Sequence, residues 1–566
     1  MTNMKTDRPL ADRLSFYAPA LIMLMLLIAG AMGTSRAEQA LTTLDATQKS
    51  GVPDDSKLEA LGAVIGTITF VRMNVFDMSQ KGENNSLYRL ANRLHIMTRE
   101  STLLSQLLFR VGDAYSRRIL DESERLLRRN EYLYDAKISV ASYHDGVLDI
   151  VVWTRDLWTL IPDISLSRTG GENKKGFAVS EKNLMGFGSE ISLAWSDTVD
   201  RESTSFTFFD QNLFKSRTSL FFRLSDNSDG SVERLRVTRP FFALDTRWAA
   251  GTDLLNADFE NQFYDLGTPV AEYRQQSEYY TLYGGRSSGL QDGWVRRWTV
   301  GFVFDDNQFS AATDGELEVL IPEDRRLIYP YVGLVLLEDN FKTSTNRDQI
   351  GRTEDFFLGT RLAANLGFAS ENFDSDRDAL IYSASMRQGF GSMEKKALLL
   401  STMLSGRVEE GNSADTRFNL NARYYGQQSA KWLLKITVDG TWGHNLDLDK
   451  LLELGGDSGL RGYPLRYQTG DSVALISIEE RYFTDWYPFR LMRVGFAAFA
   501  DVGRTWGDNP AGSSSLGWLK DVGFGLRLAP TRASSNKVFH IDVAFPLDGD
   551  PSIDSVQFLL TSSRSF

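Results

Sequence analysis

The residues of this chain that could take part in covalent chemistry are few and scattered. A serine follows an aspartate between glycines in Gly456-Asp457-Ser458-Gly459, where it could act as a nucleophile only with a histidine base beside it. The chain has no cysteine, which excludes disulfides, thiolate chemistry and zinc–cysteine sites. Its four histidines show no metal-ligand spacing: His95, His144, His444 and His540. We therefore predict that the protein is not an enzyme and has no catalytic residue, metal site or cofactor, and we interpret the serine segment as a turn.

The overall charge gives no basis for binding nucleic acid. The formal net charge is −12 at pH 7, and no long block of lysine and arginine interrupts the acidic composition. Proteins that bind a phosphate backbone concentrate positive charge on one face or along one element. We predict no nucleic-acid partner.

The N-terminal residues have the pattern of a secretory leader. Basic residues precede an apolar run over 18–33, and Ser35-Arg36-Ala37 is a small-x-small cleavage site. The alternative, a retained membrane anchor, is disfavoured because the run is shorter than a spanning helix. We predict a signal peptide over 1–37 and a polar, flexible tether over 38–62.

Segments of strict alternation dominate the chain from residue 176 to 566. In 417–424, Arg and Asn alternate with apolar residues, so that one face of the strand is apolar and the other is polar. A soluble sandwich would bury the apolar face, whereas a membrane barrel exposes it to lipid around a wet lumen. Charges in mid-strand and aromatic clusters such as 482–489 favour the barrel. We predict a mainly β fold, a transmembrane antiparallel barrel of about 16 strands.

A small α+β domain is expected ahead of the barrel, over 63–165. A strand pattern near 64–76 precedes two helical patterns near 103–108 and 116–127. Two strands then flank Asp145-Gly146, a strong hairpin signal. The order of elements is β-α-α-β-β.

One segment links the barrel to a known family. Residues 455–463, ending in Leu460-Arg461-Gly462-Tyr463, resemble the loop motif of the BamA-type superfamily of outer-membrane insertases, autotransporter-assembly factors and two-partner-secretion transporters. Later segments follow in the order seen in that superfamily: a strand with Ser477, Glu479 and Arg481, then 499–503, 523–527, Asp542 and Pro546. The β-α-α-β-β domain resembles its POTRA module, here present once.

The resemblance implies that the loop 455–470 folds back into the lumen, where its Arg461 binds acidic residues of the wall. Strand parity independently places Glu479 and Asp501 on the lumen side, so we predict these two as its partners. Glu480 has the opposite parity and is expected near a strand end at the membrane interface.

The last strand carries Phe558 and Leu560 before the terminal Phe566, resembling an assembly signal of membrane barrels. It is expected to meet a first strand near 183–193 at a seam.

The family implies a function without covalent chemistry, namely protein insertion or polypeptide translocation at the bacterial outer membrane. Its partners would be the lipid bilayer and an extended client polypeptide, bound through a periplasmic POTRA-like domain. Two alternatives remain: a structural or surface-antigen barrel with a plugged pore or a lipid-handling role, and an outer-membrane lipase, which nothing in the sequence favours.

Overall fold

The computed structural model describes residues 52–563, apart from 313–319, 511, 513–514, 535–536 and 552. The expected signal peptide, most of the tether and Phe566 lie outside the described residues. None of the described helices has the length and apolar content needed to cross a membrane.

The N-terminal part of the described chain is a small α+β domain. Its parallel and antiparallel pairs form a three-stranded sheet in the order β1-β3-β2. Its elements are α4 (Asp55–Ala60), β1 (Val64–Met73), α5 (Ser86–Leu94), α6 (Glu100–Gln106), α7 (Arg117–Arg128), β2 (Leu133–His144) and β3 (Val147–Asp156).

The domain has its own apolar core, and that core begins earlier than expected. Leu58 on α4 is fully buried beside Leu103 of α6 and Ile150 of β3, so residues 55–60 are a packed helix rather than part of a tether. Helix α5 was also not expected, because it follows a polar stretch. The remaining elements lie near their expected positions.

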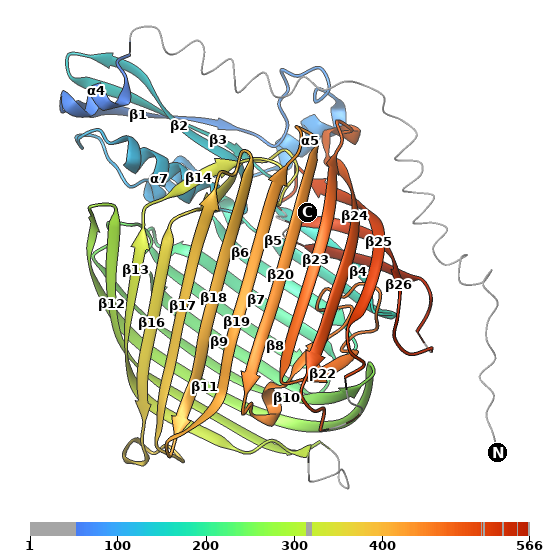
Figure 1. The fold of residues 1–566 in the computed structure, drawn as a ribbon. Coiled ribbons are helices and arrows are strands. Elements are labelled where there is room, and N and C mark those ends of the chain that lie inside the picture. The colour runs from blue at the N-terminus through green and yellow to red at the C-terminus, as the bar shows by residue number, and fades with distance from the viewer. Residues whose placement is uncertain are drawn as a thin grey trace.

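The rest of the chain forms a closed antiparallel barrel (Figure 1). Within the described residues it has 20 strands rather than the expected 16. The strands are β4 (Leu160–Thr169), β5 (Glu172–Glu181), β6 (Ser189–Asp197), β7 (Glu202–Leu213), β8 (Thr218–Asn227), β9 (Gly230–Arg239), β10 (Trp248–Asp265), β11 (Thr268–Gln291), β12 (Trp294–Ala311), β13 (Arg325–Glu338), β16 (Thr360–Ala369), β17 (Ala379–Gly391), β18 (Lys396–Glu409), β19 (Asn412–Gln427), β20 (Trp432–His444), β23 (Ser472–Phe483), β24 (Met492–Trp506), β25 (Leu519–Pro530), β26 (Val538–Pro546) and β27 (Gln557–Ser563).

Two features of the chain explain the larger number of strands. Some turns use only two residues, as in Asp292-Gly293 and Glu410-Gly411, where both residues have positive φ as two-residue hairpins of this kind require. The barrel also begins at Leu160 rather than at 176, so β4 and the first four residues of β5 lie in a region that was expected to belong to the domain and its linker.

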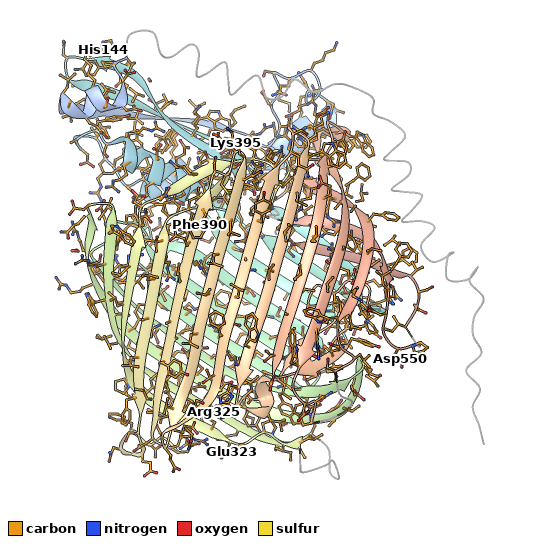
Figure 2. All side chains as sticks on the ribbon, viewed as in Figure 1. His144, Glu323, Arg325, Phe390, Lys395 and Asp550 are labelled. Atoms are coloured by element: carbon orange, nitrogen blue, oxygen red, sulfur yellow. The ribbon has the colours of Figure 1, made fainter. Side chains whose placement is uncertain are left out.

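The barrel exposes apolar side chains on its outer surface. Val300, Phe302 and Phe524 lie in mid-strand and are 62%, 42% and 59% exposed. Figure 2 shows Phe390 and Lys395 near the end that carries the α+β domain, with Arg325 and Glu323 at the opposite end. We call these the domain end and the far end.

The barrel closes where β27 meets β4, not where it meets 183–193. Among the described residues, the pairing at this seam consists of one register pair, Leu560 with Arg168. On its other side, β27 is paired with every residue of β26 from Val538 to Ala544. Residues 183–193 instead form the 3-10 turn η1 (Leu184–Gly186) and the start of the third barrel strand. The seam is therefore the weakest junction described in the wall.

Candidate functional site in the barrel lumen

The lumen loop, residues 455–470, enters the barrel from the far end, and its Arg461 binds the wall. The Arg461 guanidinium donates to both carboxylate oxygens of Asp501, at 2.7 and 2.9 Å, and to Ser477 Oγ at 3.1 Å. It also lies 3.3 Å from Glu479 Oε1 and 3.4 Å from the centre of the Phe499 ring. A planar guanidinium can make these bonds at once because its five N–H groups form a rigid fork. The structure thus brings together the three charged residues that the sequence singled out.

Glu479 is the centre of a larger charge cluster. One of its oxygens accepts from Arg527 at 2.9 Å and the other from Arg481 at 2.7 Å, in addition to the contact with Arg461. Arg527 also pairs with Asp542 on β26. Removing carboxylates and guanidiniums from water is costly unless each is paired, and here the pairs extend over four strands.

The other motif residues fit the lumen loop against the wall. Leu460 and Tyr463 are fully buried, and the Tyr463 hydroxyl donates to Asp548 Oδ1 at 2.6 Å. The Gly462 backbone N–H donates to Asp521 Oδ2 at 2.9 Å. A Cβ on Gly462 would lie 2.6 Å from the Asp521 Cβ, so only glycine allows this approach.

The lumen loop also reaches the opposite wall. Arg466 pairs with Asp200 Oδ1 at 2.7 Å in the turn after β6, and its guanidinium lies over the ring of Tyr264 in β10. A Cβ on Gly170, in the turn between β4 and β5, would lie 2.3 Å from the Leu465 nitrogen. The loop therefore bridges the lumen and contacts strands on both sides of the seam.

A second loop enters the lumen from the domain end and was not expected. The hairpin of β14 (Phe341–Ser344) and β15 (Glu354–Phe357) joins β13 to β16, and we call its tip, residues 345–353, the plug loop. Asp348 of the plug loop lies 3.1 Å from Lys435 Nζ and 3.6 Å from Arg423 Nη1. It also accepts from the Tyr425 hydroxyl at 3.0 Å.

An apolar cluster holds the tip of the plug loop in place. Ile350 is only 4% exposed and belongs to a cluster built largely from inward-facing side chains near the domain end. Its members come from the plug hairpin and from strands β18 to β26: Ile350, Phe356, Leu358, Met393, Ala397, Tyr425, Leu433, Phe483, Ala497, Ala529 and Val538. Burial of an isoleucine contributes about 1.5–3 kcal/mol, so displacing the tip carries a substantial cost.

The α+β domain holds the plug hairpin from outside the barrel. Arg128 at the end of α7 makes a bidentate pair with Asp355, at 2.8 and 2.6 Å. Thr353 donates to Asp135 at 2.9 Å, and Tyr134 donates to the Gly351 carbonyl at 2.8 Å. Displacing the plug loop therefore also breaks contacts with the domain.

A relay of hydrogen bonds through Arg481 connects the two loops inside the barrel. Arg481 donates to the Arg347 carbonyl of the plug loop at 2.7 Å and to Glu479, which in turn contacts Arg461 of the lumen loop. Arg481 is 1% exposed, so water screens these bonds poorly.

Comparison with known proteins gives neighbours only at the level of solved structures. No family model matches the chain, and no curated protein matches it. CdiB from Acinetobacter baumannii is 12% identical, with a TM-score of 0.41 over 99% of this chain and 100% of that one. CdiB from Escherichia coli is 13% identical, with a TM-score of 0.35 over 99% of each chain. BamA from Haemophilus ducreyi lacking POTRA domains 1–3 is 12% identical, with a TM-score of 0.37 over 88% of this chain and 84% of that one.

The structural neighbours are thus BamA and CdiB barrels. Scores of this size carry no argument about activity, and the functional reasoning rests on the contacts described above.

Several important residues of the site were not among the predicted ones. Arg527, Asp521 and Asp542 all lie on the inward parity of their strands, and that parity is the signal that could have identified them. The plug loop has no such signal, because it is an irregular polar segment. Glu480 lies near a strand end as expected, three residues before the domain end of β23, and accepts a hydrogen bond from the Gln428 side-chain amide.

Of the other predicted positions, Phe558 is 61% exposed on the outer face of β27, and Leu560 forms the seam pair.

The segment 285–289 has the Gly-x-Ser-x-Gly spacing of hydrolase nucleophiles. It lies inside β11 rather than at a strand-to-helix turn, so it lacks the backbone geometry that exposes such a serine.

Glu354, at the base of the plug loop, has an unusual environment for a carboxyl group. Burial raises its pKa to about 8, and the neighbouring Asp348 adds to the shift. Three backbone N–H donors, of Arg347, Asp348 and Gln349, oppose it. The closed loop therefore favours the protonated carboxyl.

We expect the closed plug loop to weaken as the pH rises. A carboxyl whose pKa is higher in the closed loop than in water stabilises closure at low pH, and this contribution is lost between about pH 4.5 and 8. Because the chain has no native cysteine, an Ile350→Cys variant carries a single thiol. This thiol should react with a thiol-specific label several-fold faster at pH 8.5 than at pH 5.5, after both rates are divided by the rate of a free cysteine peptide at the same pH. Adding Glu354→Gln should remove the difference. An equally steep profile in that double variant would contradict the assignment.

Proposed function

We propose that this protein is an outer-membrane barrel that inserts or translocates polypeptides by conformational change, without covalent chemistry. The observation that carries the proposal is the weak seam beside an anchored lumen loop. In the described part of the chain, one register pair joins β27 to β4, while Arg461 fixes the loop to β23 and β24.

The outer surface of the barrel supports a location in the membrane. Apolar side chains face outward in mid-strand, whereas the inward face holds the charge clusters around Glu479 and Asp348. A soluble protein would bury the apolar band, and a closed barrel satisfies every backbone group within lipid. The α+β domain would then lie on the periplasmic side.

The lumen and the seam support a polypeptide as the client. Two loops obstruct the lumen, so passage needs their displacement rather than free diffusion. Only one described register pair joins β27 to β4, and an extended chain could add to such a weakly paired edge by strand addition. The resemblance of residues 455–463 to the superfamily motif agrees with this client class.

A structural barrel with a plugged pore is the second candidate. The observation in its favour is that the plug loop is held from both sides, by the apolar cluster around Ile350 and by Arg128 of the domain. In this case neither loop would move during the life of the protein.

Depletion of the protein separates the two candidates. We expect the amounts of other outer-membrane barrels, of secreted proteins, or of both to fall, as measured by quantitative proteomics of the membrane and culture fluid. Unchanged pools with intact growth would reject the transport proposal and leave the structural one.

Locking the seam tests the route. An Arg168→Cys/Leu560→Cys pair, oxidised to a disulfide, should abolish client handling, and reduction of the disulfide should restore it. The matched control is Ile541→Cys/Leu560→Cys, because Ile541 is the register partner of Leu560 on β26 and its bridge leaves the seam free. Full activity of the locked seam pair would show that clients do not use this junction.

A further inference from the structure

Helix α5 carries an apolar stripe that no described residue covers. Leu87, Leu90 and Leu94 repeat at helical spacing and are 66%, 48% and 63% exposed. Tyr88 is buried on another side of the same helix, where its ring stacks on Phe76. A stripe three leucines long on the surface of a small domain is an unusual exposure of apolar area unless another phase or partner covers it.

Contacts place this stripe at the rim of the barrel. The Tyr88 hydroxyl bonds to the carbonyl of Phe489, in the turn between β23 and β24, and Glu83 pairs with Arg532, in the turn between β25 and β26. Figure 1 shows α5 beside the ends of β23 and β24. The helix therefore lies over the strands that precede the seam.

The segment that follows α5 lies over the strands on the other side of the seam. The Arg99 backbone N–H donates to the Gly186 carbonyl at 3.1 Å, between β5 and β6, and the Arg99 guanidinium lies over the Phe187 ring. We call the exposed apolar residues along this path the rim shelf: Leu87, Leu90, Leu94, Ile96, Met185, Phe187 and Phe489.

We propose that the rim shelf lies in the periplasmic leaflet of the outer membrane, with α5 as an interfacial helix beside the seam. This rests on the proposed membrane location of the barrel. The shelf continues the outer apolar band, because Phe489 and Phe187 belong to barrel turns. Arg89 and Arg93 are exposed along one edge of the stripe, where guanidiniums would meet anionic phospholipid headgroups.

The consequence is a second attachment of the α+β domain. Besides its contacts with the barrel, the domain would hold lipid directly beneath the junction of β27 and β4. Short interfacial helices with leucines on one face and arginines beside them bury the apolar face at the boundary between headgroups and acyl chains.

Spin labels at single cysteines test this in the full chain, which has no native cysteine. The protein is reconstituted in vesicles of phosphatidylethanolamine and phosphatidylglycerol with a label at Leu90→Cys or Leu94→Cys. Accessibility to oxygen relative to a water-soluble nickel chelate should be several-fold higher there than at His144→Cys, on the exposed domain hairpin far from the barrel (Figure 2). Arg93→Cys, on the same helix, should give an intermediate value.

A label at Val300→Cys, in the middle of the outer band, distinguishes the two possible failures. Water-like values at Leu90 and Leu94 with a lipid-like value at Val300 would overturn the rim shelf and leave the membrane barrel intact. Water-like values at all three would reject the membrane barrel itself. Labels at 90 and 94 that are shielded from both reagents would indicate a protein contact, which also overturns the lipid assignment.

Discussion

Replacing the plug loop, residues 345–353, by Asn-Gly should make the barrel conduct ions, and adding Arg466→Ala should increase the conductance further. Ser344 and Glu354 are register partners, so a two-residue turn can close the hairpin without disturbing β14 and β15. The change removes Asp348 and Ile350, which hold the loop to the wall and to the apolar cluster. A barrel of 20 strands is wide enough for an aqueous lumen once its loops leave.

The effect of Arg466→Ala depends on the plug loop because the two loops obstruct the lumen in series. Alone, this change frees the lumen loop from Asp200 while the plug loop still blocks the domain end, so conductance should stay near that of the unmodified protein. In the combined variant both obstructions weaken, and conductance should rise several-fold above that of the plug replacement alone. Planar-bilayer recordings measure all three variants.

A point variant covers the case in which the shortened hairpin does not fold. Ile350→Asp places a carboxylate in an apolar cluster, which is costly enough to displace the tip from the lumen. Folding of each variant is judged by heat-modifiable migration on gels. If a folded variant that combines either plug change with Arg466→Ala conducts no more than the unmodified protein, the plug loop is not the barrier.

Replacing Arg461 by Ala should lower the free energy of unfolding of the barrel by about 3–5 kcal/mol, the usual loss when one partner of a buried ion pair is removed. Asp501 is fully buried and would lose two charge-assisted bonds. Glu479 would keep Arg481 and Arg527, so the loss falls mainly on Asp501. Urea unfolding from lipid vesicles measures the change, and client handling should fall with it.

A double-mutant cycle separates the ion pair from the rest of the loop. Arg461→Ala/Asp501→Ala removes both charges and should be more stable than the sum of the two single changes predicts, because no uncompensated carboxylate remains. Arg461→Lys keeps the charge but not the forked geometry, and it should fall between the parent and the alanine variant. Additive single and double effects would show that Arg461 acts through packing on Phe499 rather than through Asp501.

Much of the lumen site follows from strand periodicity. Alternation with a period of two assigns Glu479 and Asp501 to the inner face, and the motif around Arg461 supplies a cation for them. The same reasoning assigns Arg527 and Asp542 to the inner face once their strands are aligned. It does not give the number of strands, because each has a weak signal and two-residue turns leave little to mark the boundaries.

The plug loop and the rim shelf could not be predicted for a different reason. Asp348 and Ile350 lie in an irregular segment whose place is decided by Lys435 and by apolar side chains from distant strands. Leu87, Leu90 and Leu94 do repeat at helical spacing, but a sequence pattern shows only that a helix has an apolar face. Which surface lies opposite that face is a property of the assembled fold.

The relay through Arg481 couples the positions of the two loops. Since Arg481 holds the plug loop at Arg347 and the lumen loop through Glu479, loss of either loop from its place removes bonds that support the other. Thermodynamic linkage then requires the influence to be mutual: if release of the plug loop favours release of the lumen loop by some factor, release of the lumen loop favours release of the plug loop by the same factor. Under the proposed function, a client that displaces the loop at one end of the lumen would therefore also loosen the loop at the other end.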